Sequence, residues 1–272
     1  MTHSSEVGRS AVVAGLDTNY HDQGNGPPLL LLHGSGPGVS AWANWRLAIP
    51  EWSKQFRVVA PDLIGFGFTA PAGDGAYTLA RWVGHVVSLL DWLEIRRTHV
   101  VGNSFGAAVA LRLAIEQPER VERLVLMGPV GVSFPITKAL DEVWGYTPSL
   151  ENMKRILDLF AYDRELVTDE LAELRYRASL RPGAQEAFSV MFPAPRQRWV
   201  EALASSDDEV RGIQHDTLIV HGRDDRVIPL ATSLRLLELI SPSRLHVFGR
   251  CGHWVQIEHT DSFNHLVLEF LL

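Results

Sequence analysis

The stretch from Val100 to Gly106, Val-Val-Gly-Asn-Ser-Phe-Gly, constrains the chain most, because an apolar run passes through a glycine-flanked serine into a helical pattern. We interpret it as a strand, a sharp turn and a helix. Gly102 and Gly106 remove the side chains that would collide where strand and helix meet. Such a turn lifts the Ser104 hydroxyl clear of its surroundings, and the helix N-terminus favours negative charge beside it. Ser104 is therefore predicted to be a nucleophile; the alternative is a plain glycine-rich turn.

Short apolar runs alternate with helical patterns over most of the chain. The runs carry Val, Ile and Leu on successive positions, as strands covered on both faces require. The alternation predicts an α/β fold with a mostly parallel sheet flanked by helices. The expected strands cover residues 28–32, 56–60, 98–101, 123–127, 216–220 and 244–248, and the expected helices 41–53, 79–93, 105–117, 230–239 and 261–271.

The alternation stops between residues 131 and 211, where only helical segments are predicted. Pro193 should end the third of them, because proline disfavours a helical conformation at Phe192. A helical insertion between strands should lie over the carboxyl ends of the sheet. We therefore expect a core of residues 1–130 and 212–272 with a helical cap, residues 131–211. The expected cap helices are 151–161, 168–180, 183–191 and 196–205.

Composition excludes several classes of protein. The balance of 25 Lys+Arg against 32 Asp+Glu gives a net charge of −7 with no basic stripe, so we expect no nucleic-acid partner. Cys251 is the only cysteine, which excludes an internal disulfide, and we expect it to be a buried packing residue. The polar N-terminus and the absence of an apolar run of about 18 residues predict a cytoplasmic protein without a membrane partner. There is no HExxH motif and no Walker lysine, so neither a metal nor a nucleotide cofactor is expected.

A second motif follows the apolar run at residues 29–32, where the chain enters a loop, residues 34–38, with three glycines. Acyl transfer needs two backbone N–H groups aimed at a developing oxyanion, and such a loop exposes them. We assign one donor to Phe105 N–H and the other to the N–H of Ser35 or Gly36. The alternative is a simple glycine turn. His33 is expected to hold this loop by hydrogen bonding.

A base and an acid must come from other loops. In α/β-hydrolases the order along the chain is serine, acid, histidine. Asp225 follows the strand at 216–220, and a glycine three residues before it with an apolar pair and a proline after it resembles the spacing of that family. This resemblance favours Asp225 over Asp224, which we interpret as a turn or salt-bridge residue. His253 follows the last strand and is the expected base, with Asp225 fixing its tautomer. The histidines that fit less well by position are His221, His246, His259 and His265.

Four segments together resemble the meta-cleavage product hydrolases, carbon–carbon bond hydrolases of bacterial aromatic catabolism. The similarity runs from about Gly24 to the C-terminus. Phe105 and the cap segments 191–193 and 196–199 resemble the branch that acts on 2-hydroxymuconic semialdehyde and its small alkyl relatives. Ala107 departs from the pattern, since a third glycine is usual there. The four segments are residues 34–38, 43–46, 102–106 and 249–254.

This resemblance implies a substrate of the 2-hydroxy-6-oxohexa-2,4-dienoate type. The products would be 2-hydroxypenta-2,4-dienoate and formate or a short carboxylic acid, formed without a cofactor. The carboxylate of such a substrate needs a cation in the site.

The cap helix at residues 168–180 offers a cation. Leu171, Leu174 and Ala178 are predicted to share one face with Arg175, and Arg177 to point away from it. A guanidinium on an apolar face favours an anion, and a bidentate bond to a carboxylate suits it. The alternative is an internal ion pair with a cap Glu or Asp.

Further polar residues near the site have two interpretations. Asn44 and Asn103 offer amide donors for the substrate's 2-oxygen and carboxylate, and Trp254 can flank the planar dienoate. Each of them could instead have a structural role. The apolar cap residues Leu157, Phe160, Phe188 and Met191 are expected in the core rather than in a specificity pocket.

Two other functions use the same residues. A carboxylesterase would need the triad alone, and a small-molecule binding protein could retain the triad without turnover. The apolar C-terminal run, residues 266–272, can pack on the core or on a second copy, so a homo-oligomer is an open expectation.

Overall fold

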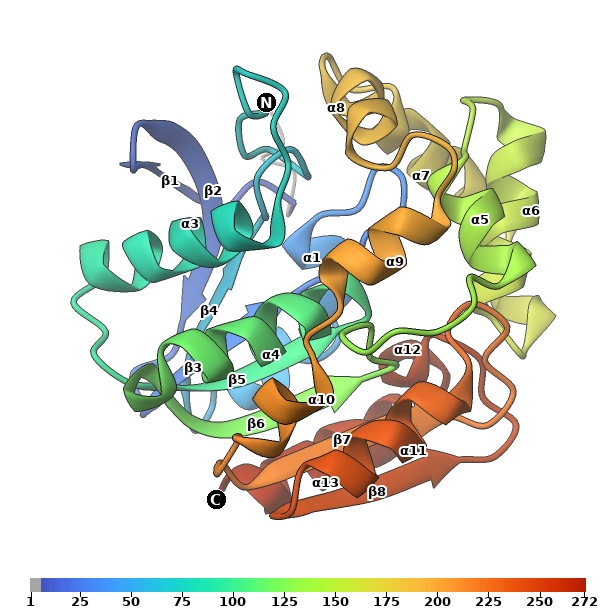
Figure 1. Cartoon of the computed structure of the whole chain (residues 1–272). Helices are drawn as coiled ribbons and strands as arrows, with labels where there is room; N and C mark the ends of the chain where they lie inside the picture. Colours follow the sequence, from blue (N-terminus) through green and yellow to red (C-terminus); the bar gives the residue numbers. More distant parts are fainter. Residues whose placement is uncertain (1–5) are drawn as a thin grey trace.

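The computed structural model describes residues 6–272, which form one eight-stranded sheet flanked by helices (Figure 1). The strand order is β1-β2-β4-β3-β5-β6-β7-β8. β1 pairs with β2, and β2 with β4, in antiparallel fashion, and every other pair is parallel. The fold class predicted from the sequence is confirmed. The strands are β1 (Arg9–Val13), β2 (Leu16–Gln23), β3 (Pro28–Leu32), β4 (Arg57–Pro61), β5 (Thr98–Asn103), β6 (Val121–Met127), β7 (Thr217–Gly222) and β8 (Ser243–Phe248).

Side chains of β3 alternate between two hydrophobic cores, one on each face of the sheet. Leu29 and Leu31 lie in the core with α1, α2 and α13, and Leu30 and Leu32 in the core with α3, α4 and α11. A strand covered on both faces is apolar at every position, which is why a continuous run predicted it. The helices of the first face are α1 (Ala41–Trp45), α2 (Ile49–Trp52) and α13 (Thr260–Leu271), and those of the second α3 (Leu79–Trp92), α4 (Phe105–Glu116) and α11 (Leu230–Leu239).

The expected strands and core helices are present, with three differences. The helix expected over 41–53 is broken into α1 and α2, because the ring of Pro50 would collide with the carbonyl four residues before it in a continuous helix. The short helix α12 (Val255–Glu258) was not expected. The strands β1 and β2 were also missed, because they lie at the antiparallel edge, where Val12 is 65% exposed, and lack a continuous apolar run.

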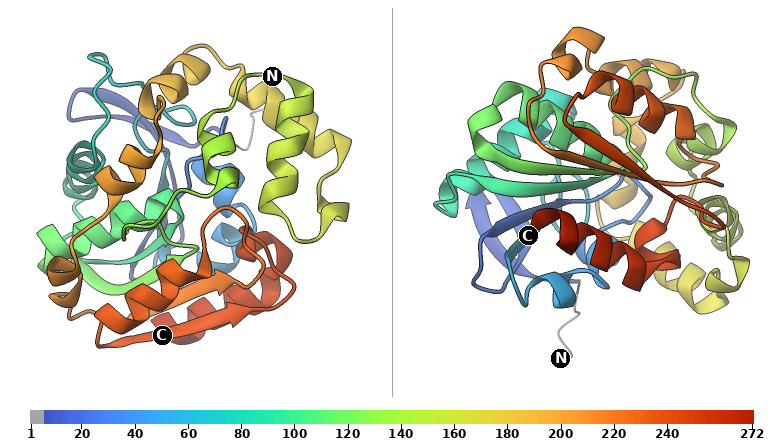
Figure 2. Two further views of the ribbon diagram at one scale, coloured as in Figure 1. Left: turned by 45° about the vertical axis from the view of Figure 1, so that its right-hand side comes forward. Right: turned by 90° about the horizontal axis from the view of Figure 1, so that it is seen from below.

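Helices fill the connection between β6 and β7. Four of them were expected, and α5 and α10 (Asp207–Arg211) were not. Figure 2 shows α5 to α8, coloured yellow-green to gold, gathered at one end of the molecule. The third expected helix ends at Met191, as Pro193 predicted. The division into core and cap at residues 131 and 211 stays a prediction, and α10 contacts α4 and α11 of the core. The helices beyond the sheet are α5 (Lys138–Trp144), α6 (Leu150–Phe160), α7 (Asp169–Ser179), α8 (Ala184–Met191) and α9 (Gln197–Leu203).

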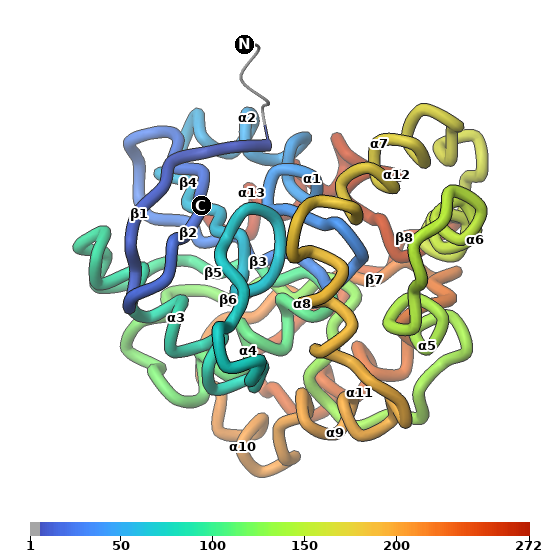
Figure 3. The backbone as a smooth tube through the Cα atoms, turned by 90° about the horizontal axis from the view of Figure 1, so that it is seen from above, coloured from blue at the N-terminus to red at the C-terminus, as the bar shows by residue number. Residues whose placement is uncertain are grey.

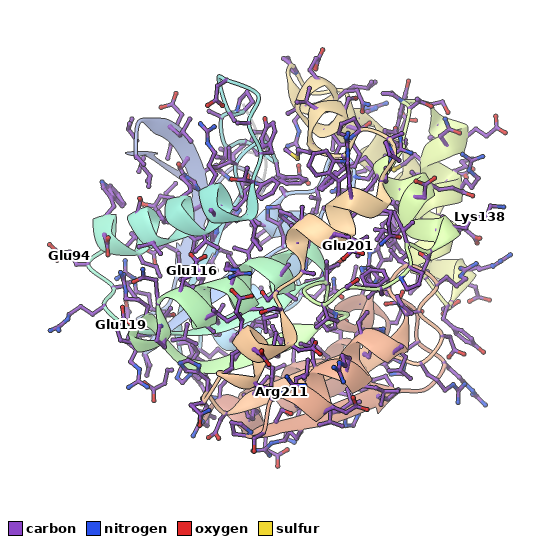
Figure 4. All side chains as sticks on the ribbon, in the orientation of Figure 1. Glu94, Glu116, Glu119, Lys138, Glu201 and Arg211 are labelled. Carbon is purple, nitrogen blue, oxygen red and sulfur yellow. The ribbon has the colours of Figure 1, made fainter. Side chains whose placement is uncertain are left out.

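The surface carries charged side chains. Figure 4 shows Glu94, Glu119, Lys138 and Arg211 pointing away from the ribbon, and each of them is exposed. Cys251 is fully buried, as expected. Among residues 6–272, none of the helices combines the length and the apolar composition that a membrane span requires.

The turn between β5 and α4 depends on two glycines. A Cβ on Gly102 would lie 2.5 Å from the Gly106 carbonyl oxygen, and one on Gly106 would lie 2.3 Å from the Leu32 carbonyl oxygen. The collision predicted from the sequence is therefore real. Between them Ser104 has a φ of 54° and a ψ of −113°, a backbone conformation that is rare outside glycine. Ala107 is fully buried, so α4 packs closely with a methyl group at that position.

His33 joins the loop after β3 to the loop after β4. Its Nδ1–H donates to the Gly34 carbonyl oxygen at 2.7 Å, and the Leu63 N–H donates to its Nε2 at 2.9 Å. Burial lowers the pKa of His33 to about 4, so the ring stays neutral at ordinary pH. The expectation that His33 holds the loop by hydrogen bonding is confirmed.

Gly106→Ala should destabilise the fold by on the order of 1–3 kcal/mol, because its methyl group meets backbone oxygens of β3 that cannot move aside. Chemical denaturation followed by circular dichroism measures this change. The matched control is Gly84→Ala in the middle of α3, where an added Cβ meets nothing within 4 Å. The control should gain about 0.5–1 kcal/mol from helix propensity. Equal effects of both substitutions would contradict the steric explanation.

His33 should make stability fall in acid. An unfolded chain takes up the proton near pH 6.5, whereas the folded ring does so only near pH 4. Stability is therefore present above pH 6.5 and is lost as pH falls toward 4, by up to about 3 kcal/mol. The difference in unfolding free energy between the wild type and His33→Gln, measured from pH 7 to 4, should shrink by that amount. A difference that does not change with pH would show that His33 is not the cause.

Candidate active site

One cavity lies between the carboxyl edge of the sheet and the helices α5, α6 and α7. Its lining includes residues 34–37 after β3, Ser104 after β5, Val227 after β7 and His253 after β8. In Figure 3, α5 and α6 lie on the side of the molecule that carries β7 and β8, opposite β1 and β2. The structure therefore brings the predicted nucleophile and base to one enclosed space.

Backbone hydrogen bonds hold Ser104 at the N-terminus of α4. Its N–H donates to the Met127 carbonyl oxygen at 2.8 Å, and its own carbonyl oxygen accepts from Val130 N–H at 3.2 Å. Its side chain lines the cavity together with the ring of His253. Within residues 6–272 the two side chains share no hydrogen bond, and catalytic hydrogen bonds of this kind often tighten only when substrate binds.

Asp225 and His253 form a short hydrogen bond. The Nδ1–H of His253 donates to Asp225 Oδ2 at 2.6 Å, which leaves Nε2 as the acceptor of the neutral ring. The other oxygen of Asp225 accepts from Val227 N–H at 2.7 Å and from Ile228 N–H at 2.9 Å. Burial alone would raise the pKa of Asp225, but the charge of His253 and the hydrogen bonds from His253 and His221 outweigh it and hold that pKa well below its usual range. Asp225 is thus an anion that can orient the imidazole.

Asp224 lies outside this arrangement. Its Oδ2 pairs with Arg223 Nη2 at 3.4 Å and accepts from Cys251 N–H at 3.3 Å. These are the contacts of a turn and salt-bridge residue, which is the interpretation that its position favoured.

His221 lies beside the carboxylate of Asp225, and the sequence analysis did not assign it a role. It is fully buried, its Nε2–H donates to the Ile228 carbonyl oxygen at 3.0 Å, and the same nitrogen lies 3.4 Å from Asp225 Oδ2. Its Nδ1 is 2.7 Å from Ser233 Oγ. The sequence did contain a signal for this role, because His221 lies near the end of the strand that leads into the loop of Asp225.

The predicted oxyanion donors belong to two adjacent segments. Phe105 is the first residue of α4, so its N–H has no acceptor within the helix. A Cβ on Gly34 would lie 3.4 Å from Ser104 Cβ, which shows how close the loop of Ser35 and Gly36 comes to the serine. The donor roles stay predictions. Trp144 of the cap was missed, and its Nε1–H donates to Ser35 Oγ at 2.9 Å.

Asn44 and Asn103 are linked to each other. Asn44 Oδ1 accepts from Asn103 Nδ2 at 2.8 Å and from Gly34 N–H at 3.2 Å. The Nδ2 of Asn44 is buried and has no partner among the described residues. Asn44 therefore has a donor to spare for a ligand, whereas Asn103 uses its amide on Asn44; their substrate-binding roles stay predictions.

Arg175 points into the cavity and not into solvent. Its side chain is only 11% exposed, and its Nη1 lies 3.8 Å from Glu6 Oε1 without a hydrogen bond to any described residue. Burial lowers the pKa of Arg175 to about 10, so it remains a cation at neutral pH. The carboxylate near it comes from the segment before β1 rather than from the cap, and Arg181 contacts the same carboxylate at 3.3 Å.

The predicted apolar face of the Arg175 helix was wrong in one member. Leu171 and Ala178 face inward with Arg175, but Leu174 is 57% exposed. The buried face of α7 is centred on Ala172, Arg175 and Ser179, and a helical step of 100° per residue puts position 174 beyond its edge. Arg177 is exposed and pairs with Glu173 at 2.8 Å.

Phe160 and Leu157 belong to the hydrophobic core, as expected, and they also line the cavity. The Phe160 ring stacks on His253 at a centroid distance of 5.6 Å and on Trp254 at 5.3 Å. The position of these two core residues at the edge of a cavity is not revealed by periodicity. Phe188 and Met191 are buried outside this cavity, as expected.

Arg46 and Gln256 also line the cavity and were missed. Arg46 Nη1 donates to the Ala43 carbonyl oxygen at 2.9 Å, and burial lowers the pKa of Arg46. Gln256 is only 3% exposed, and its Oε1 has no partner among residues 6–272. Arg46 belongs to the segment 43–46 that carried the resemblance, which was the available signal.

Comparisons with known proteins agree with this geometry. A family model described as the alpha/beta hydrolase fold matches residues 27–260. A 2-hydroxy-6-oxo-2,4-heptadienoate hydrolase of Pseudomonas putida is 62% identical over 268 residues, which are 98% of this chain and 97% of that protein. A 2-hydroxymuconate semialdehyde hydrolase of a Pseudomonas species is 59% identical and covers 99% of this chain and 95% of its own length.

A solved structure has the same overall fold. A meta-cleavage product hydrolase from Pseudomonas fluorescens, crystallised as a serine-to-alanine variant with acetates, matches with a TM-score of 0.97 and 58% identity over 98% of each chain. The chain therefore belongs to the α/β-hydrolase fold family and, within it, to the meta-cleavage product hydrolases.

Proposed function

We propose that this protein hydrolyses the C5–C6 bond of 2-hydroxy-6-oxohexa-2,4-dienoates, such as 2-hydroxymuconic semialdehyde and its small 6-alkyl analogues. The products are 2-hydroxypenta-2,4-dienoate and a short carboxylic acid. The observation that carries the proposal is the buried guanidinium of Arg175, which lines the same cavity as Ser104 and has a nitrogen without a hydrogen-bond partner among the described residues. An anionic substrate with a carbonyl to be attacked fits these two features together.

The polar side chains of the cavity suit the carboxylate and the 2-oxygen of the substrate. Arg175 and Arg46 supply positive charge there, and the unpaired Nδ2 of Asn44 supplies a neutral donor. Charge-assisted bonds from a guanidinium to a carboxylate are about twice as strong as neutral ones. In this proposal Arg175 binds the carboxylate and Trp254 flanks the planar diene. Asn44, which is held by its hydrogen bond from Asn103, donates to the 2-oxygen.

Much of the cavity lining is apolar. Leu140, Val143, Met153 and Ile156 of the cap contribute to it together with Val227 of the core. This lining offers no charged partner for a second carboxylate at C6, and it favours hydrogen or a small alkyl group. The relatives named as heptadienoate and semialdehyde hydrolases support the same size of substituent.

The reaction has two stages. First the 2-hydroxyl proton leaves and a proton adds to C5, with His253 as the shuttle, which gives the 2,6-dioxo tautomer. Then the C6 carbonyl is attacked by the Ser104 hydroxyl, or by a water molecule that Ser104 and His253 activate, and its oxygen becomes an oxyanion near Phe105 N–H and the N–H of Ser35 or Gly36. When the carbonyl re-forms, the C5–C6 bond breaks, its electron pair is delocalised as the dienolate of the five-carbon product, and that dienolate takes up a proton on its 2-oxygen. If water attacks, the short carboxylic acid forms in this step; if Ser104 attacks, a water molecule activated by His253 then hydrolyses the acyl ester, which releases the acid and restores the serine hydroxyl.

Asp225 and His253 have separate roles in both stages. Asp225 keeps the proton of the neutral ring on Nδ1 and stabilises the imidazolium that forms. No step needs a metal or an organic cofactor. A cytoplasmic location and a homo-oligomer stay predictions.

Arg175→Ala should lower kcat/KM for the anionic dienoate by about 100-fold or more, the cost expected when a buried charge pair loses one partner. Turnover of a neutral p-nitrophenyl ester should be retained, because that substrate has no carboxylate. Arg177→Ala is the matched control, an exposed arginine on the same helix, and should affect neither substrate. Equal loss on both substrates would favour a carboxylesterase over the proposed function.

Ser104→Ala should abolish decay of the yellow dienolate in a single turnover while leaving substrate binding measurable by the shift of its absorbance. The wild type should consume one equivalent under the same conditions. If the wild type binds the dienolate without consuming it, the protein is a binding protein and the proposal fails.

A further inference from the structure

Glu258, at the end of α12, joins the loop of the catalytic histidine to the cap. Its Oε1 accepts from Gly252 N–H at 2.7 Å, directly before His253. Its Oε2 accepts from Tyr162 N–H at 2.7 Å and from Asp163 N–H at 2.9 Å, in the segment after α6. Figures 1 and 3 show α12 close to the cap helices. Tyr162 and Asp163 lie 96 and 95 residues before Glu258, so one carboxylate holds together two segments that are far apart in the chain.

The same two segments also meet directly. The His253 N–H donates to the Phe160 carbonyl oxygen at 2.7 Å, and the Phe160 ring stacks on the His253 ring. A Cβ on Gly252 would lie 2.4 Å from that carbonyl oxygen, so the backbones are as close as glycine permits. The position of His253 therefore depends on where the end of α6 lies.

The acid loop is fastened to the end of α6 as well. Arg226, the residue after Asp225, donates from Nη2 to the Ala161 carbonyl oxygen at 2.9 Å and also to the Asp158 carbonyl oxygen. Residues 158–163 are consequently tied to both loops that supply the Asp225–His253 pair. Removal of the Glu258 carboxylate takes away the acceptor of three N–H groups, those of Gly252, Tyr162 and Asp163.

We propose that Glu258 is a positioning residue for His253, and that it sets the imidazole against Ser104 by holding residues 251–253 on the cap segment 161–163. Hydrogen bonds from N–H groups to a carboxylate are short and strong, so they can fix a loop to a fraction of an ångström. A displacement of about 1 Å in a catalytic group can cost on the order of 100-fold in rate. This proposal rests on the role of His253 in the proposed function but not on the identity of the substrate.

Cys251 provides a probe of the loop. It is the only cysteine, it is fully buried, and its Sγ lies 3.9 Å from Glu258 Oε1. Burial raises the pKa of its thiol, so alkylation by iodoacetamide should be slow while the loop is held. Opening of the loop should make the labelling faster.

The experiment compares Glu258→Ala and Glu258→Gln with Glu209→Ala. Glu209 is a matched control, because its carboxylate also binds several donors, Arg112 and Ser206, and it does not line the cavity. Glu258→Ala should lower kcat about 10- to 100-fold on both the dienoate and a neutral ester with little change in KM. Glu258→Gln keeps one acceptor oxygen and should recover part of this loss. Cys251 should be alkylated faster in Glu258→Ala than in Glu258→Gln, because both variants remove the negative charge that helps to raise the thiol pKa but only the alanine removes every acceptor. Glu209→Ala should change neither kcat nor labelling.

Two results would overturn the proposal. One is an unchanged kcat in Glu258→Ala despite a lower melting temperature or faster labelling, which would make Glu258 a stabilising residue only. The other is a raised KM with an unchanged kcat. If Glu258→Ala does not fold, the same criteria apply to Glu258→Gln. A loss on both substrates here, combined with equal loss on both in Arg175→Ala, would retain Glu258 as a positioning residue and reject the dienoate as substrate.

Discussion

Parallel pairing of β3, β5, β6, β7 and β8 is the constraint from which the site follows. Parallel neighbours end at the same edge of a sheet, so the loops after them meet in space however far apart they lie in the chain. The loops that carry Ser104, Asp225 and His253 follow β5, β7 and β8, and their side chains arrive at one edge of the sheet. The short bond between Asp225 and His253 then needs only local loop geometry, which Val227 and Ile228 provide through their N–H groups.

The helices between β6 and β7 supply the rest of the cavity. They contribute apolar side chains, the guanidinium of Arg175 and the indole of Trp144, which donates to Ser35. Among the residues that line the cavity, Arg46 and Arg175 are cations, Asn44 has an amide donor without a partner among the described residues, and many of the others are apolar. Burial strengthens the attraction between these cations and a bound anion, since an ion pair in a region of low dielectric is less screened than one in water.

The sequence allowed prediction of the elements that are apolar on both faces and of the motifs whose residues are adjacent in the chain. This is why β3 and α11 agree at both ends, and why Ser104, Asp225 and His253 could be named. The hairpin of β1 and β2 was missed because an edge strand is half exposed. Leu174 was misplaced because the periodicity gives a face but not its centre. Phe160 meets His253 from a segment far away in the chain, and neither composition nor spacing reports such a contact. Arg46 and His221 lie in segments that the motifs already marked, but sequence spacing does not say which side chains of a segment face a cavity or an acid.

The contact between Trp144 and Ser35 joins a cap helix to the loop expected to stabilise the oxyanion. Because of this contact, an exchange of the helices between β6 and β7 would alter the loop beneath them as well as the cavity lining. A chimaera that imports a relative's cap would inherit the specificity of the donor only if the indole and its hydroxyl acceptor were transferred together. Substrate range and chemical power in this enzyme are therefore expected to evolve as one trait.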